Sequence, residues 1–313
     1  MDQPRSRLEA ILSSGAFAVT AELATTDSAD PRSVLDMAEG LRGHVDAVNC
    51  TDNSAAHAHI SQVAAAHFLV DAGFDPVVQF VCRDRNRLAL QADILGACAL
   101  GARNVLALTG DDVSAGDHPE TNSTYDLDSL HLLRIARIMR DDGTYLSGRK
   151  LTGPPSFFLG AVENPFAPPL DYRPIRLGKK VDAGAEFFQT QMIFNMGRMR
   201  EFMKVVVDMG LNERAYILGG ICVPKSARAA HYMAENVPGT DIPAEILRRL
   251  DGTPKEKQAD EAVKLCTDMV LELKEMPGVA GVHLMGINFE EGIVRVVEDA
   301  GLLPRPEVAA QIP

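Results

Sequence analysis

The chain of 313 residues is acidic, with a formal net charge of −12 and a pI near 5.1, which argues against nucleic acid as a partner. Its hydrophobic content of 46% is ample for a large core. The five cysteines are scattered and include no Cys-x-x-Cys pair, which favours reduced thiols in a cytoplasmic protein and offers no metal cluster. We find no signal peptide and no apolar run of the roughly 18 residues that a membrane span needs.

Strands and helices are predicted to alternate along the first half of the chain. Residues 1–15 have the apolar spacing of a short amphipathic helix. Short apolar runs that end in polar residues or glycine predict four strands: Phe17–Leu23, Val45–Cys50, Pro76–Cys82 and Asn104–Leu108. The helices that follow the first three are expected to begin at Asp30-Pro31, to end near Ala72, and to run from Arg85 to Leu100.

The second half continues the alternation with longer connections. A polar segment from Asp112 to Thr124 precedes a predicted helix from Asp126 to Met139, and residues 141–155 are expected to be irregular. The remaining predicted strands are Phe157–Val162, Phe187–Gln191, Tyr216–Ile221 and Gly281–Met285. Helices are expected at 176–185, after Met196, at Pro254–Met276 and at Glu290–Ala300, with only a polar, proline-containing connection between Ile221 and Pro254.

Eight strands, each followed by a helix and with no break in composition, predict an α/β protein that folds as a single-domain (β/α)8 TIM barrel over residues 1–313. A doubly wound sheet is the alternative. The first strand is not followed by Gly-x-Gly-x-x-Gly, and no Walker loop occurs. The barrel is therefore the prediction.

Polar residues gather where the predicted strands end. In such a barrel these ends share one mouth, where they would bring together Glu22, Asn49, Gln79, Asp111, Glu163, Gln191, the Gly219-Gly220 pair and Asn288. Carboxylates among carboxamides suit acid–base chemistry on a polar heterocycle, because each amide can both donate and accept hydrogen bonds. A solvated strand end remains the alternative for Glu22, and backbone pairing for Gln191. Asp112 is interpreted as a helix cap.

Several motifs match one family over about Phe17 to Leu303. They are Glu22 at a strand end, Leu108-Thr-Gly-Asp111, Lys179-Lys-Val-Asp-Ala-Gly-Ala185, Thr190-Gln-Met-Ile-Phe194 and Gly286-Ile-Asn288. The chain resembles the flavin-dependent methylenetetrahydrofolate reductases, which act in one-carbon metabolism and methionine biosynthesis. The Gly116-Asp-His-Pro119 and Tyr125–Ser129 segments are similar to the branch found in acetogenic bacteria.

The resemblance implies that reduced flavin passes a hydride from N5 to the methylene carbon of 5,10-methylenetetrahydrofolate, giving 5-methyltetrahydrofolate. It implies that Glu22 is the general acid and that Asp111 is a carboxylate beside flavin and pterin. It also implies that Gln191 and Asn288 bind the folate substrate. Its flavin-contacting positions are Asn49, Gln79, Thr109, Gly110, Lys179 and Lys180, with the two lysines toward phosphate.

The chain departs from the family pattern at several positions. Leu23-Ala-Thr-Thr26 replaces a common Phe-Phe-Pro-Pro, Gln79 replaces a histidine and Thr109 an arginine, so FAD is expected with FMN as the alternative. Ala227 stands where other members have an aromatic residue that stacks on nicotinamide. The electron donor is thus NADH, NADPH or a partner protein.

Three hypotheses follow. The first is an autonomous reductase, and the second is a folate- and flavin-binding subunit that is active only with an electron-transfer partner. The third is a flavin-free barrel lyase or methyltransferase. A homo-oligomer is compatible with each of them.

Overall fold

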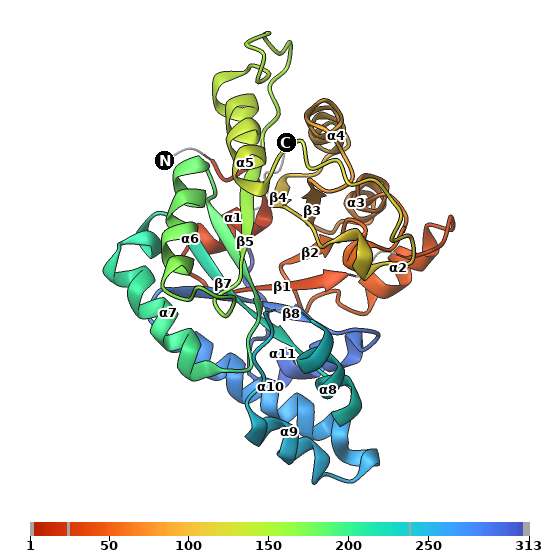
Figure 1. Ribbon diagram of the computed structural model, residues 1–313, viewed down its shortest axis with the longest axis vertical. Helices are drawn as coiled ribbons and strands as arrows, with labels where there is room; N and C mark the ends of the chain where they lie inside the picture. The colour runs from red at the N-terminus through yellow and green to blue at the C-terminus, as the bar shows by residue number, and fades with distance from the viewer. Residues whose placement is uncertain (1–2, 24–25, 238, 309–313) are drawn as a thin grey trace.

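The computed structural model describes residues 3–23, 26–237 and 239–308. Eight parallel strands close into a barrel in sequence order, with helices around them, which confirms the predicted (β/α)8 fold (Figure 1). Ala24 and Thr25, within the departure noted after Glu22, lie outside the described residues, as do both ends of the predicted 1–313 domain.

The strands lie within two residues of their predicted bounds. They are β1 Ala18–Leu23, β2 Ala47–Cys50, β3 Pro76–Val81, β4 Asn104–Leu108, β5 Phe158–Glu163, β6 Phe187–Met192, β7 Tyr216–Cys222 and β8 Val279–Met285.

The helices cover the outside of the barrel, apart from α1. They are α1 Arg7–Ser13, α2 Arg32–Glu39, α3 Gln62–Asp71, α4 Arg87–Ala99, α5 Ser129–Arg137, α6 Tyr172–Ala183, α7 Met196–Asp208, α8 Ala227–Asn236, α9 Ala244–Asp251, α10 Gln258–Lys274 and α11 Glu290–Asp299. The prediction for the connection after β7 was wrong, because this connection contains α8 and α9. Both are short, and the Pro and Gly residues around them are also typical of loops.

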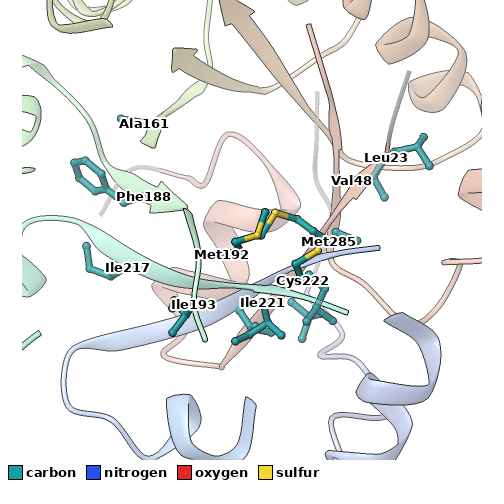
Figure 2. Packing of buried hydrophobic residues seen from close by; sticks show 14 of the residues in the cluster. Leu23, Val48, Ala161, Phe188, Met192, Ile193, Ile217, Ile221, Cys222 and Met285 are labelled. Carbon is teal, nitrogen blue, oxygen red and sulfur yellow. The ribbon is translucent and has the colours of Figure 1, made fainter. Parts of the chain in front are cut away.

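Alternation along each strand divides the core in two. Outward side chains such as Val19, Val48 and Ile217 pack with the surrounding helices in the larger apolar cluster, part of which Figure 2 shows. Inward side chains at the lower end form a second cluster with Leu8, Ile11 and Leu12 of α1, so α1 closes the bottom of the barrel. The inward residues of that cluster are Ala18, Ala47, Val77, Leu106, Phe158, Phe187 and Leu218.

Two residues further along the strands, the inward positions on β1, β2, β3, β6 and β8 are polar. Thr20, Asn49, Gln79, Gln189 and His283 are all at most 7% exposed. They form a polar layer between the apolar bottom and the mouth. Buried polar groups are costly without partners, and Thr20, Asn49, Gln189 and His283 are hydrogen-bonded to one another.

Gly160 makes room for the apolar bottom layer. A Cβ at this position would stand 2.2 Å from Cζ of Phe187. We therefore predict that Gly160→Ala lowers the free energy of unfolding in urea by about 1–3 kcal/mol, the usual cost of overpacking. Gly96→Ala is the control, because nothing lies within 4 Å of that added Cβ on α4. Equal stability of the two variants would contradict this packing.

Candidate active site

A cavity of about 450 Å³ lies at the C-terminal mouth of the barrel. Its floor is the top of the polar layer, at Gln79, Gln189 and His283, and its walls are strand ends and the loops that follow them. Val81, Leu108, Val162, Met192 and Met285 add apolar surface. A concave site with mixed lining at this end is where barrel enzymes bind their ligands.

The structure brings most of the predicted site residues to this cavity. Glu22, Gln79, Thr109, Gly110, Asp111, Lys180 and Gln191 line it. Three others are placed elsewhere. Asn49 is fully buried beneath the cavity in the polar layer. Lys179 is exposed on α6, where its Nζ donates to the Tyr172 hydroxyl at 3.0 Å. Asn288 is exposed beyond β8, with a φ of 52°.

Glu22 reaches the cavity from β1, and His283 is its charged-group neighbour on β8. Glu22 Oε2 lies 3.9 Å from His283 Nε2, and their side chains are 35% and 4% exposed. His283 Nδ1 lies 2.9 Å from Oγ1 of Thr20. Sequence reasoning missed His283, although its inward position on β8 follows from the strand period.

The polar layer continues from Thr20 across the barrel. Gln189 Nε2 donates to Thr20 Oγ1 at 3.1 Å and to Asn49 Oδ1 at 3.0 Å. Asn49 Nδ2 donates back to Gln189 Oε1 at 2.6 Å. A chain of short polar contacts thus joins β2, β6, β1 and β8 and ends at His283, whose Nε2 lies 3.9 Å from Glu22 Oε2. Gln189 was also missed, because in sequence it reads as the middle of an apolar strand.

A register shift between β6 and β7 places Gln191. Gln189 pairs with Leu218 but Met192 pairs with Gly220, so β6 carries one extra residue. The Gly220 N–H donates to Thr190 Oγ1 at 2.8 Å, which anchors the irregular segment. Bulges of this kind re-aim side chains near active sites, and here Gln191 lines the cavity.

The end of β4 is fixed by several local contacts. Thr109 Oγ1 donates to Ser129 Oγ at 3.2 Å, tying the strand to α5. Gly110 has a φ of 101°, and an added Cβ would stand 2.4 Å from Val81 Cγ1. Asp111 is exposed at the rim. Asp112 accepts from the Ser114 N–H at 2.9 Å, which confirms it as a cap, although of a short 3₁₀ turn.

Glu163 does not lie in the mouth, contrary to the sequence prediction. Alternation on β5 turns Val162 inward and Glu163 toward α6, where it is fully buried. Lys180 Nζ lies 3.0 Å from Glu163 Oε2, while Arg176 and Arg173 approach Oε1 at 3.7 and 3.8 Å. Burial lowers the pKa of Lys180, and Glu163 opposes that shift.

The cluster around Glu163 therefore carries more positive than negative charge. Arg176 and Lys180, one helical turn apart on α6, both line the cavity. The i, i+4 spacing of Arg176 and Lys180 is present in the sequence, but the sequence prediction rested on the adjacent Lys179-Lys180 pair. This edge of the cavity suits an anionic group such as phosphate.

Arg83 is a further buried cation at the mouth, with a side chain 2% exposed. Its guanidinium donates to the carbonyls of Asn53 at 3.0 Å and Asp111 at 3.3 Å, and it pairs with Asp84. It thereby holds the loops after β2, β3 and β4 together. The signal in the sequence was the Arg-Asp-Arg run directly after the third strand.

Asp52 is a buried carboxylate on the same cavity wall. Its Oδ2 accepts from the Val81 N–H at 2.8 Å and contacts Arg85. Burial raises the pKa of Asp52 to about 6, although Arg85 opposes the shift.

Within the described ranges, no three His, Cys, Asp or Glu side chains are close enough to hold a metal ion. In the same residues, no helix is both long and apolar enough to cross a membrane.

The raised pKa of Asp52 predicts a pH-dependent stability difference. The folded state binds the Asp52 proton more tightly than the unfolded chain does, because an unfolded Asp has a pKa of about 3.9. The stabilisation of the folded state by this proton is therefore full below pH ~4 and is lost as the pH rises through about 6. Asp52→Asn removes this pH-dependent stabilisation. The Tm of the variant minus that of the wild type should increase from pH 4.5 to 7.5.

Asp126→Asn is the control, because hydrogen bonds from Arg87 lower the pKa of Asp126 to about 2. Its Tm difference from the wild type should stay constant over that pH range. A difference for Asp52→Asn that is also constant would refute the raised pKa.

Known proteins match the chain in sequence. A profile described as "Methylenetetrahydrofolate reductase" matches residues 7–301. "Probable methylenetetrahydrofolate reductase (NADPH)" of Caenorhabditis elegans is 27% identical over 77% of this chain and 34% of that protein. "Methylenetetrahydrofolate reductase (NADH) 1" of Arabidopsis thaliana is 27% identical over 68% of this chain and 36% of that protein. The chain thus spans little more than a third of the length of these relatives.

A solved structure supports the fold independently. An "Uncharacterized protein from Clostridium thermocellum" that "binds two copies of 5-methyl-5,6,7,8-tetrahydrofolic acid" superposes with a TM-score of 0.67 at 14% identity, over 94% of this chain and 98% of that one. At that identity the likeness concerns the fold. Because the family profile covers nearly all of the sequence, the chain belongs to the methylenetetrahydrofolate reductase family.

Proposed function

We propose that this protein reduces 5,10-methylenetetrahydrofolate to 5-methyltetrahydrofolate with a bound flavin. The observation that carries the proposal is the placement of Glu22, Gln191 and Asp111 around one cavity in a chain of this family. A carboxylic acid can protonate a nitrogen of the imidazolidine ring as that ring opens, and a carboxamide can hydrogen-bond the donor and acceptor edge of the pterin.

The residues of the mouth fit a flavin. Arg176 and Lys180, with the net positive charge around Glu163, suit its phosphate, and Val81, Leu108 and Met285 offer apolar surface to a flat ring. Gln79 and Thr109 add polar groups at the same wall. We propose FAD as the cofactor, with FMN as the alternative. When bound and reduced, the flavin supplies the hydride that the methylene carbon accepts.

The side chains of the chain itself supply the rest of the chemistry. Glu22 donates a proton to a nitrogen of the imidazolidine ring as the bond from that nitrogen to the methylene carbon breaks. The Gln191 amide, directed by the β6 bulge, orients the pterin through its donor and acceptor atoms. The negative charge of Asp111 disfavours a second negative charge beside it and so favours loss of hydride from this site.

The electron donor is proposed to be NADH or NADPH; relatives are named for each of them. The alternative is a subunit that depends on an electron-transfer partner. It is favoured by Ala227, which has no aromatic ring to stack on nicotinamide. Ala227 is 6% exposed at the start of α8, and its N–H donates to the Gln258 side chain at 3.0 Å. Anaerobic stopped-flow mixing with NADH and NADPH separates the two, because rapid bleaching of the flavin requires an autonomous reductase.

Glu22→Gln tests the general acid. We predict that the variant loses at least about 100-fold in folate reduction, the lower range for general acid catalysis, while it binds flavin as tightly as the wild type. Turnover and the flavin dissociation constant are the two measurements. Glu213→Gln, at an exposed position before β7, is the control and should change neither. Full turnover in Glu22→Gln would remove Glu22 from this role.

Arg176→Gln tests the cationic edge. Arg176 lines the cavity, whereas Lys179 hydrogen-bonds Tyr172 outside it. Arg176→Gln should therefore weaken flavin binding, and Lys179→Gln should not. Loss of one charge-assisted hydrogen bond corresponds to about a tenfold higher dissociation constant. The constants can be measured by fluorescence quenching of added flavin. Equal constants for both variants would place the phosphate elsewhere.

A further inference from the structure

We propose that Glu163 is a positioning residue for the flavin phosphate, because it holds the Lys180 ammonium and the Arg176 guanidinium at the cavity wall. The inference rests on the proposed function, in which this cationic edge binds the phosphate. It assigns a task to a fully buried carboxylate that no step of that chemistry has used. One buried acid among three basic side chains thereby prepares an anion site before any ligand arrives.

One face of α6 carries all three basic side chains. Arg173, Arg176 and Lys180 follow one another at intervals of three and four residues, which places them along the same side of the helix. Their nearest nitrogens lie 3.8, 3.7 and 3.0 Å from the Glu163 carboxylate on β5. A buried carboxylate is costly unless cations compensate for the lost water, and these three side chains supply that compensation.

Lys180 has one hydrogen to offer to a ligand. Its ammonium carries three N–H groups, and two of them donate inside the protein, to the Val162 carbonyl and to Glu163 Oε2 at 3.0 Å. In the part of the chain that the structure describes, the third has no acceptor, and Lys180 lines the cavity although it is only 3% exposed. The two internal contacts therefore fix the ammonium with one donor left for the mouth.

The two arginines differ in their freedom. Arg173 donates to the carbonyls of Ala167 and Pro168, at 2.5 and 2.7 Å, so its guanidinium is tied to the loop after β5. Among the described residues, the Arg176 side chain makes no hydrogen bond, and it is 32% exposed beside Glu163. Arg176 can therefore turn to an anion in the cavity, while the carboxylate attracts it to the wall.

The charges of the cluster leave a surplus for the ligand. Three cations face one carboxylate, and a phosphate monoester at neutral pH carries a charge of about −1.5 to −2. Burial lowers the pKa of Lys180, Glu163 opposes that shift, and Arg176 and Arg173 add to it. Glu163 thus helps a buried amine to stay cationic.

Other charged groups near Lys180 enter any pH profile. The buried residues of α5 and α7, which flank α6, are uncharged, and Arg137 of α5 donates to the Asp182 carbonyl at the end of α6. The charged and titratable groups across the cavity are Glu22, Asp52, Arg83, Asp111 and His283. Glu163→Gln leaves all of these groups in place, so its difference from the wild type reports the Glu163 charge.

Carbon NMR of protein with ¹³C-labelled lysine tests the pairing without any flavin. The Lys180 signal is assigned by its loss in Lys180→Gln, and its change with pH gives the pKa of Lys180. This pKa should be lower in Glu163→Gln, because the amide keeps the shape of the side chain without its charge. Glu186→Gln is the control and should not change it, since Glu186 bridges Arg5 and Arg140 at the opposite end of the barrel. An unchanged pKa in Glu163→Gln would overturn the proposal.

Flavin binding then tests the role toward phosphate. The dissociation constants of FAD and FMN should rise as the pH passes the pKa that Lys180 has in the free protein, because a neutral amine makes no charge-assisted hydrogen bond. Between pH 7 and 9 the rise should be about tenfold in Glu163→Gln and smaller in the wild type and in Glu186→Gln. Riboflavin has no phosphate, so its constant should show no such difference among the three proteins.

The two measurements separate the failures. A lower pKa of Lys180 in Glu163→Gln, with a pH dependence of flavin affinity equal to that of the wild type, would mean a merely structural ion pair and would contradict the proposal. If no flavin binds the wild type, the proposed function fails. In that case inorganic phosphate is the probe: it should shift the Lys180 signal at pH 9 more in the wild type than in Glu163→Gln, and equal shifts would overturn the anion site.

Glu163→Asp provides the graded comparison. Its charge lies one methylene further from Lys180, so both measurements should fall between those of the wild type and Glu163→Gln. If Glu163→Gln does not fold, Glu163→Asp takes its place, and wild-type values in both measurements would then contradict the proposal.

Discussion

The buried polar layer is the constraint on which the rest of the site depends. Asn49, Thr20, Gln189 and His283 face one another inside the barrel, at most 3% exposed, and each has a partner in the layer. Leaving one such group unpaired costs about 1–3 kcal/mol. The strands that carry them must therefore keep their register, and that register brings Glu22 and His283 to the same cavity.

The layer also separates stability from chemistry. Below it, α1 and the aromatic side chains of Phe158 and Phe187 fill the barrel, with ring centroids 4.7 Å apart. Above it, charged side chains surround an open cavity. Substitutions at the bottom should thus change unfolding without reaching the mouth. The hydrogen-bonded groups in between connect the mouth residues to the rigid bottom of the barrel.

Much of the architecture was readable from the sequence, because a buried parallel strand needs a continuous apolar run and eight such runs alternate with helices. The inward and outward placement of individual side chains was not. Glu163 and Val162 exchange sides with a register change of one residue, and Gln191 depends on a bulge that no local signal marks. The strand ends pointed to Glu22 and Asp111, and the family resemblance added Lys180, but Arg176 and His283 required the packing of distant strands and helices.

In the proposed function, a reduced flavin bound in this mouth gives its hydride to a folate. The direct measurement is anaerobic: the flavin-loaded protein is photoreduced, mixed with 5,10-methylenetetrahydrofolate without any other electron donor, and followed by absorbance. The oxidised flavin spectrum should return with one 5-methyltetrahydrofolate formed per flavin. A reduced spectrum that persists, or product formed equally by flavin-free protein, would contradict the claim.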